Sequence, residues 1–263
     1  MKTKVRGFEM AYEDTGGAGI PLLLVHGFPL DRTLWAAQVR GLANLARVIV
    51  PDLRGFGESG LPTGAVTVDV YAEDLRGLLD VLGIKSAVVA GLSMGGYIAF
   101  AFYRQNPQRV RGLILANTKA GADSLEGKKG RDDSAALARE KGTAAIAERM
   151  LPKMLTPKTA VEHPLIAATV NTMMSRQSVD GVVGALAAMR DRPDSTPTMS
   201  QVSVPTLVIT GAEDNLIPPK ESELMRDGIR GSRLVTIPGA AHLSSVEQPD
   251  AFNQAVREFL KSL

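Results

Sequence analysis

The sequence contains no cysteine, and only 5% of its 263 residues are aromatic. Without cysteine the chain has no disulfide, no thiolate nucleophile and no cysteine-ligated zinc or iron–sulfur centre. Long apolar runs and blocks of like charge are also missing: 30 basic and 28 acidic residues are scattered along the chain. These absences argue against a membrane protein and a nucleic-acid-binding protein. Because Met1–Arg6 lacks the apolar core of a signal peptide, we expect a soluble, cytoplasmic protein.

The apolar residues form a pattern of strands that alternate with helices. This pattern predicts an α/β fold in which helices cover both faces of a mostly parallel sheet. The expected strands are Thr3–Arg6, Phe8–Glu13, Leu22–Val25, Arg47–Val50, Ala87–Ala90, Leu113–Leu115, Thr206–Ile209 and Leu234–Ile237, of which the first two form an antiparallel hairpin. The expected helices are Leu34–Asn44, Val66–Leu82, one that begins at Met94, Pro219–Gly228 and Ala251–Leu260.

No strand-like run occurs between Thr118 and Val202. This stretch is rich in Ala, Met, Lys and Glu, and an unstructured loop of about 80 residues would be implausible inside a compact protein. We therefore expect a core domain formed by residues 1–118 and 202–263, with a helical cap at residues 119–201 inserted in it. An insertion at the carboxyl edge of a parallel sheet lies where ligands bind.

A candidate nucleophile, Ser93, lies in the segment Gly91-Leu92-Ser93-Met94-Gly95, between an expected strand and an expected helix. A serine in a sharp strand-to-helix turn needs small neighbours, because the backbone approaches adjoining chain closely there. The same turn places the hydroxyl at the N-terminus of a helix, where negative charge is stabilised. The alternative is a plain helix N-cap, but the context favours a nucleophile.

A serine hydroxyl needs a base, and the chain has three histidines. His242 follows an expected strand in a loop of small residues, which favours it as the partner of Ser93. His26 ends a buried strand and is interpreted as a structural histidine. His163 lies before a proline within the insertion, where a solvated or capping role is expected.

The third member of a triad should orient the imidazole and stabilise its cation. Asp214 follows the expected strand Thr206–Ile209, and the order Ser93, Asp214, His242 is that of a nucleophile-elbow hydrolase. Glu213 is its nearest competitor, and Asp123 is a weaker alternative. We expect the oxyanion hole to be formed by two backbone amides, those of Phe28 and Met94.

Together these segments resemble the α/β-hydrolase family, and the likeness spans essentially the whole chain. Within this family the sequence is similar to small bacterial carboxylesterases and to 3-oxoadipate enol-lactonases. The resemblance implies a helical cap and names no cofactor or metal. It rests on His26-Gly27-Phe28-Pro29, Asp52–Ser59, Gly91–Gly96, Gly211-x-x-Asp214 and Gly239-x-x-His242, in the family's order.

Two related activities are disfavoured by the sequence. Haloalkane dehalogenases and epoxide hydrolases have an aspartate where this chain has Ser93. Epoxide hydrolases also use tyrosines of the cap, whereas no Phe, Tyr or Trp occurs from Arg104 to Ala251. Trp35 and Tyr97, which follow the two oxyanion segments, are candidates for the floor of the acyl pocket, although core packing is the favoured interpretation.

Three functions remain in competition. The leading hypothesis is a serine esterase that acts through an acyl-enzyme on small esters with short-to-medium acyl chains. The second is an enol-lactone hydrolase with the same chemistry, in which peroxide in place of water would give a perhydrolase side activity. The third is a ligand sensor that retains the triad. The lactone substrate carries a carboxylate and therefore requires a cation in the pocket, supplied by one of Lys119, Arg131, Arg176 or Arg190.

Overall fold

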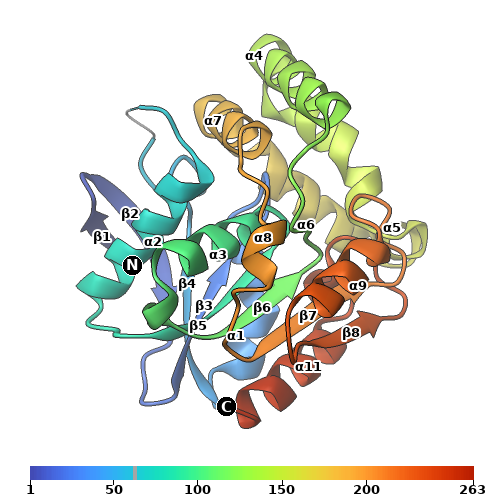
Figure 1. The fold of residues 1–263 in the computed structure, drawn as a ribbon. Helices are drawn as coiled ribbons and strands as arrows, with labels where there is room; N and C mark the ends of the chain where they lie inside the picture. Colours follow the sequence, from blue (N-terminus) through green and yellow to red (C-terminus); the bar gives the residue numbers. More distant parts are fainter. Residues whose placement is uncertain (62–63) are drawn as a thin grey trace.

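Eight strands form one sheet in the spatial order β1-β2-β4-β3-β5-β6-β7-β8 (Figure 1). The computed structural model describes residues 1–61 and 64–263. β1 pairs antiparallel with β2, β2 pairs antiparallel with β4, and the remaining neighbours are parallel. The strands are β1 (Lys2–Val5), β2 (Phe8–Asp14), β3 (Ile20–Val25), β4 (Ala46–Pro51), β5 (Ala87–Leu92), β6 (Val110–Ala116), β7 (Thr206–Gly211) and β8 (Arg233–Ile237).

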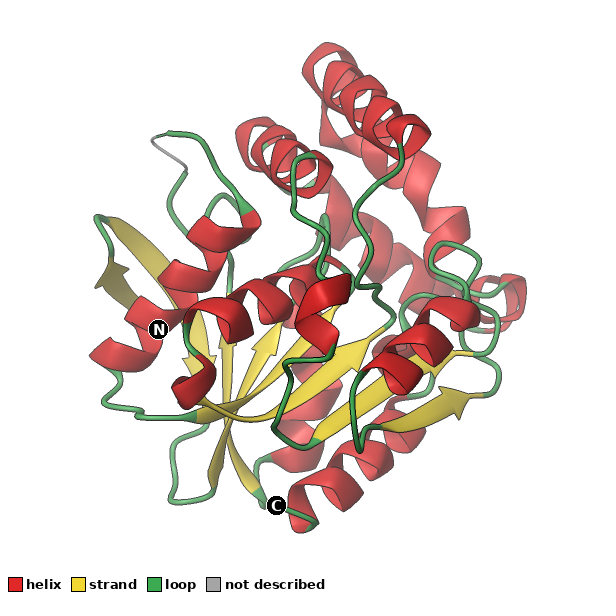
Figure 2. Cartoon of the chain, in the orientation of Figure 1, coloured by secondary structure: helices red, strands yellow, loops and turns green. Residues whose placement is uncertain are grey.

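Helices cover both faces of this sheet (Figure 2). The buried side chains of α2, α3 and α9 pack on one face, and those of α1 and α11 pack on the other. β3 is buried on both sides: Leu23 and Val25 belong to the first group, and Leu22 and Leu24 to the second. The predicted α/β fold is confirmed. These helices are η1 (Arg32–Trp35), α1 (Ala36–Leu42), α2 (Val68–Val81), α3 (Met94–Gln105), η2 (Pro107–Arg109), α9 (Pro219–Gly228), α10 (Ser244–Glu247) and α11 (Pro249–Lys261).

Five helices lie between β6 and β7 and form a helical insertion, α4–α8. The long helix α4 is interrupted at Gly142, whose φ of +77° breaks the helical backbone. α4 packs against α6 and α7, and in Figure 1 α4 and α7 lie together above the sheet. Their bounds are α4 (Leu125–Met154), α5 (Pro157–Glu162), α6 (Pro164–Ser175), α7 (Val179–Arg190) and α8 (Thr196–Met199).

Most predicted boundaries are shifted by one to three residues, and two of these shifts have a clear local cause. The helix expected over Leu34–Asn44 begins earlier, as the 3-10 turn η1, because the Asp31 carboxylate accepts hydrogen bonds from the backbone amide and hydroxyl of Thr33. β6 begins at Val110, three residues before the expected strand. The exposed Arg111 and the buried Gly112 interrupt the apolar run there, so the sequence pattern showed only the apolar stretch that follows them.

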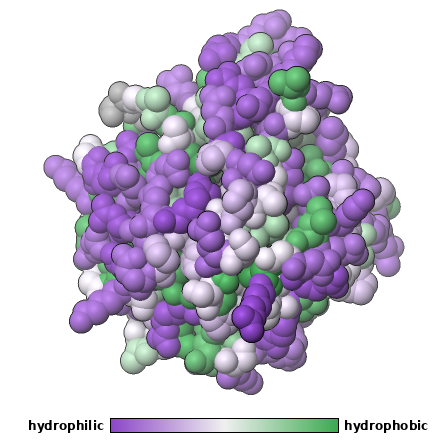
Figure 3. All heavy atoms as spheres, in the orientation of Figure 1, coloured by the Kyte–Doolittle hydropathy of each residue, from purple (hydrophilic) through white to green (hydrophobic). Residues whose placement is uncertain are grey.

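The surface seen in Figure 3 is mostly hydrophilic, and apolar side chains interrupt it in scattered groups. Among the helices of the described residues, none combines the length and the apolar character needed to cross a membrane.

Candidate active site

Ser93 occupies the sharp turn between β5 and α3, with φ +56° and ψ −115°. The turn is fixed by a hydrogen bond from the Ser93 amide to the Ala116 carbonyl (2.9 Å) and by one from the Thr118 hydroxyl to the Ser93 carbonyl (2.7 Å). Gly91 and Gly95 are required, because a Cβ on either would collide with backbone carbonyl groups. The hydroxyl is thereby held at the carboxyl edge of the sheet and at the N-terminus of α3.

Ser93 lines a small cavity of about 100 Å³. The helical insertion provides one wall of it, and the loops that follow β3, β6 and β7 contribute others. Its wall combines apolar side chains with polar ones, two of which are cationic. Its lining residues are Phe28, Ser93, Tyr97, Lys119, Arg131, Met150, Met189, Leu216 and Ile217.

His242 and Asp214 form a buried pair, with 2.9 Å between Nδ1 of the imidazole and Oδ2 of the carboxylate. They are 0% and 2% exposed. Because a carboxylate only accepts, Nδ1 carries the proton and donates it to Asp214. Within the described part of the chain, the other nitrogen, Nε2, has no hydrogen-bond partner. Nε2 is therefore the unprotonated nitrogen of the ring, and no hydrogen bond joins it to Ser93 in this structure.

Asp214 is held by four hydrogen-bond donors. Oδ1 accepts the backbone amides of Leu216 (3.0 Å) and Ile217 (2.9 Å), and Oδ2 accepts Nδ2 of Asn117 (2.9 Å) as well as His242. Burial raises the pKa of Asp214, but the hydrogen bond and charge of His242, aided by the amides, leave that pKa below its usual value. The group is therefore an anion at neutral pH.

Asn117 is a residue of the site that the sequence analysis did not predict. Its Nδ2 also donates to the Ala241 carbonyl (3.1 Å), and its Oδ1 accepts the hydroxyl of Ser244 (2.6 Å). It thereby joins the loop that carries Asp214 to the loop that carries His242. One signal was present in the sequence: an asparagine directly after a strand tolerates the left-handed backbone seen here, φ +47°.

The amides proposed for the oxyanion hole lie on either side of the Ser93 turn. Met94 is the first residue of α3, so its amide has no acceptor within the helix. Phe28 follows Gly27, and a Cβ built on Gly27 would lie only 3.3 Å from the Cβ of Ser93. Neither amide donates to another group of the described residues.

The other histidines and acids lie in different surroundings. His26 is buried, with Nδ1 2.9 Å from the Gly27 carbonyl and Nε2 accepting the Leu53 amide (3.0 Å). Burial also lowers the pKa of His26, so it is a neutral, fully bonded side chain. His163 and Glu213 are exposed. Asp123 forms ion pairs with Arg131 and other cations. Among the described residues, no hydrogen bond joins it to His242.

Two of the four candidate cations, Lys119 and Arg131, line the cavity of Ser93. Both face Asp123, at 3.4 Å and 3.0 Å. Buried Arg192 also pairs with Asp123 (3.0 Å), and its guanidinium lies 3.9 Å above the ring of Tyr97. Three cations thus share one carboxylate, and this side of the cavity carries an excess of positive charge.

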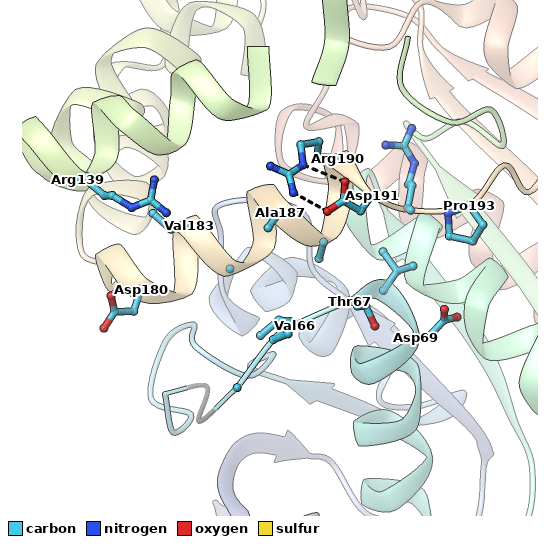
Figure 4. Close-up of a pocket in the computed structure, with 16 residues that line it drawn as sticks. Val66, Thr67, Asp69, Arg139, Asp180, Val183, Ala187, Arg190, Asp191 and Pro193 are labelled. Carbon is cyan, nitrogen blue, oxygen red and sulfur yellow. Dashed lines mark hydrogen bonds and ion pairs between the residues drawn. The ribbon is translucent and has the colours of Figure 1, made fainter. Parts of the chain in front are cut away.

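The other two candidate cations lie elsewhere. Arg176 is paired with Asp31. Arg190 is paired with Asp191 and lines a different cavity of about 550 Å³ between α7 and residues 64–69, which does not include Ser93 (Figure 4).

The two aromatic residues considered for the floor of the acyl pocket lie in different parts of the structure. Tyr97 lines the cavity of Ser93. Trp35 is not among the lining residues; it is fully buried and packs against Phe252, with 5.9 Å between ring centroids. Its place in the structure is the core between the sheet and α11.

Comparison with known proteins identifies the family. A family model described as the alpha/beta hydrolase fold matches residues 20–249. The chain is 31% identical to 3-oxoadipate enol-lactonase 2 of Acinetobacter baylyi, over 95% of this chain and 92% of the relative. The fold and the comparisons define an α/β hydrolase, and the chain belongs to the α/β-hydrolase family.

Two solved structures are similar over nearly the full length. A thermophilic esterase from Thermogutta terrifontis with malate bound has 45% identity and a TM-score of 0.97, covering 100% of this chain and 98% of that one. The enol-lactonase from Burkholderia xenovorans has 31% identity and a TM-score of 0.93, covering 99% of this chain and 100% of that one. The resemblance predicted from the motifs is confirmed.

Proposed function

We propose that this protein is a serine esterase that uses Ser93, His242 and Asp214. The observation that carries the proposal is the combination of a serine on a strained turn with a buried His–Asp pair whose Nε2 is free. Esterases and enol-lactonases among its relatives support the same reaction class. No metal is needed for this chemistry, which depends on a base and two amide donors.

In the proposed reaction, the Ser93 hydroxyl gives its proton to Nε2 of His242 as its oxygen bonds to the ester carbonyl carbon. The carbonyl oxygen becomes an anion and is bound by the amides of Phe28 and Met94. His242 then protonates the departing alcohol, which leaves an acyl group on Ser93. Water repeats the sequence, releasing the acid and restoring the hydroxyl. Asp214 stabilises the imidazolium in both halves.

The size of the cavity favours small acyl groups. The cavity of about 100 Å³, lined by Met150 and Met189 of the helical insertion, has the size of a short acyl chain, and a longer chain would have to extend beyond it. Methionine is flexible, so we expect tolerance among short acyl groups. We therefore propose short-to-medium esters as substrates.

The kcat/KM for p-nitrophenyl esters should fall from short acyl chains toward palmitoyl. We expect the maximum between acetyl and hexanoyl and a decrease of at least about tenfold at palmitoyl, because most methylenes of a long chain extend beyond the cavity of Ser93. The measurement is a series from acetyl to palmitoyl below the critical micelle concentration. A maximum at palmitoyl would contradict the small-pocket assignment.

A second candidate is supported by Lys119 and Arg131. Their excess positive charge beside Ser93 suits an ester or lactone that carries a carboxylate. An enol-lactonase relative and an esterase structure with malate, a dicarboxylate, agree with this preference. We propose that carboxylated esters or lactones are favoured over neutral ones of equal length.

Arg131→Gln should reduce kcat/KM for mono-p-nitrophenyl succinate by about tenfold while changing that for p-nitrophenyl butyrate by less than about twofold. A hydrogen bond from a guanidinium to the substrate carboxylate is lost only with the first ester. Arg190→Gln, which lies in the other cavity, is the matched control and should affect neither ester. An equal decrease with both esters would show that Arg131 acts on the structure and not on substrate charge.

A further inference from the structure

Glu247, at the end of α10, is a buried carboxylate that is 8% exposed. Within the described ranges it forms no ion pair with a basic side chain. Its two oxygens instead accept backbone amides from two separate segments: Oε2 accepts that of Ala241 (2.6 Å), and Oε1 accepts that of Thr156 (2.7 Å). Burial of a charge is costly unless such bonds offset it, so both bonds are held strongly.

These segments are the loop that carries His242 and the turn between α4 and α5. Ala241 directly precedes His242, and the amide of Leu243, directly after it, donates to the Met154 carbonyl at the end of α4 (3.0 Å). The backbone on both sides of His242 is therefore bonded, through Glu247 or directly, to the helical insertion. On its other side the loop is bonded to the core domain: the Ala241 carbonyl accepts Nδ2 of Asn117 (3.1 Å), and the Ala240 carbonyl accepts the Glu213 amide (2.9 Å).

The same helix reaches the cavity of Ser93. Met150, one turn before Met154 on α4, lines that cavity, whereas Met154 and Thr156 bond to the His242 loop and to Glu247. A shift of the end of α4 therefore moves both the wall that contacts substrate and the support of the imidazole. Packed, hydrogen-bonded segments of this kind transmit small displacements.

We propose that Glu247 is a positioning residue that couples the helical insertion to His242. Through it, the position of the C-terminal end of α4 determines the alignment of Nε2 of His242 with Ser93. The inference rests on the proposed function, because it assigns His242 as the base. Glu247 itself does not contact the reacting atoms.

Glu247→Gln is expected to lower kcat for p-nitrophenyl acetate by about 10- to 100-fold with KM changed by less than about twofold, as a misplacement near 1 Å would. Glutamine has nearly the size of glutamate, but its side-chain NH₂ group would face the backbone amide of Ala241 or Thr156. Two donors would then oppose each other, and one of the two hydrogen bonds would be lost. The rate constant for phosphonylation of Ser93 by a fluorophosphonate should fall in parallel. This rate constant does not depend on the folded fraction, so it separates misalignment from unfolding. Glu223→Gln, an exposed charge removal on α9, is the control.

A second pair of variants tests the link from the side of the insertion. Thr156 has φ −66°, which proline adopts without strain, so Thr156→Pro deletes the amide that Glu247 accepts. It also removes the side chain that caps α5, and Thr156→Ala removes that cap alone. We expect the rate constant for phosphonylation of Ser93 to be at least about threefold lower in Thr156→Pro than in Thr156→Ala.

Equal phosphonylation rate constants for Thr156→Pro and Thr156→Ala would overturn the coupling. So would a wild-type rate constant in Glu247→Gln, even with a lowered melting temperature. If Glu247→Gln does not fold, the Thr156 pair decides the question. Failure of the proposed function is a different result, namely activity that persists when Ser93 is replaced.

Discussion

Ser93→Ala is expected to abolish ester hydrolysis, with a loss in kcat of up to about a million-fold, the size seen when a nucleophilic serine is removed from a triad. Alanine has no oxygen to bond to the carbonyl carbon, so no acyl-enzyme forms. The His242–Asp214 pair and the oxyanion amides do not depend on the hydroxyl and should stay in place. The measurement is kcat for p-nitrophenyl acetate, with protein free of contaminating esterase.

The fold of this variant should be intact, because the Ser93 hydroxyl makes no hydrogen bond within the described residues that helps to hold the turn. Circular dichroism and the melting temperature are the controls. The cavity is unchanged, so the variant should still bind the acid product. Turnover near the wild-type rate would reject Ser93 as the nucleophile.

Asp214→Asn should lower kcat by about 10⁴-fold, the loss known for the equivalent change in a serine protease triad. The structure gives the reason. Oδ1 accepts the amides of Leu216 and Ile217, so the asparagine oxygen stays there and its NH₂ faces His242. Nδ1 must then accept instead of donate, which places the imidazole proton on Nε2. In that tautomer His242 has no lone pair to take the proton of Ser93.

Glu213→Gln is the matched control for the acid assignment. It changes the neighbouring carboxylate in the same way, but Glu213 is exposed and has no bond to His242. Its kcat should stay within about twofold of the wild type. A large loss in Glu213→Gln with a mild effect in Asp214→Asn would transfer the role to Glu213.

The sequence predicted those parts of the molecule that depend on local patterns. Buried strands such as β3 are continuous apolar runs, and each predicted strand is present. The turn at Ser93 was predictable because glycines are needed at fixed offsets from it. The proximity of Asp214 and His242 was predictable because each follows a strand, and parallel strands end at one edge of the sheet.

Contacts between distant segments were not predictable in the same way. Asn117 bonds to Asp214 and Glu247 bonds to Thr156, pairs that are 97 and 91 residues apart. No periodicity marks such partners, since each side chain is ordinary for its own element. The cations Lys119 and Arg131 were named together with two others, because the direction of a side chain depends on how α4 packs against α7.

The most direct test of the account is to identify the residue that a fluorophosphonate labels, by peptide mass mapping, while residual esterase activity is followed. We expect one label per chain, on the peptide that contains Ser93, with activity lost in proportion to labelling. The proposed mechanism assigns the nucleophile to Ser93 and the base to His242, so the phosphonyl group should be transferred to the Ser93 hydroxyl. Full labelling of Ser93 with esterase activity retained, or inactivation by a label on another residue, would contradict the assignment of Ser93 as the nucleophile.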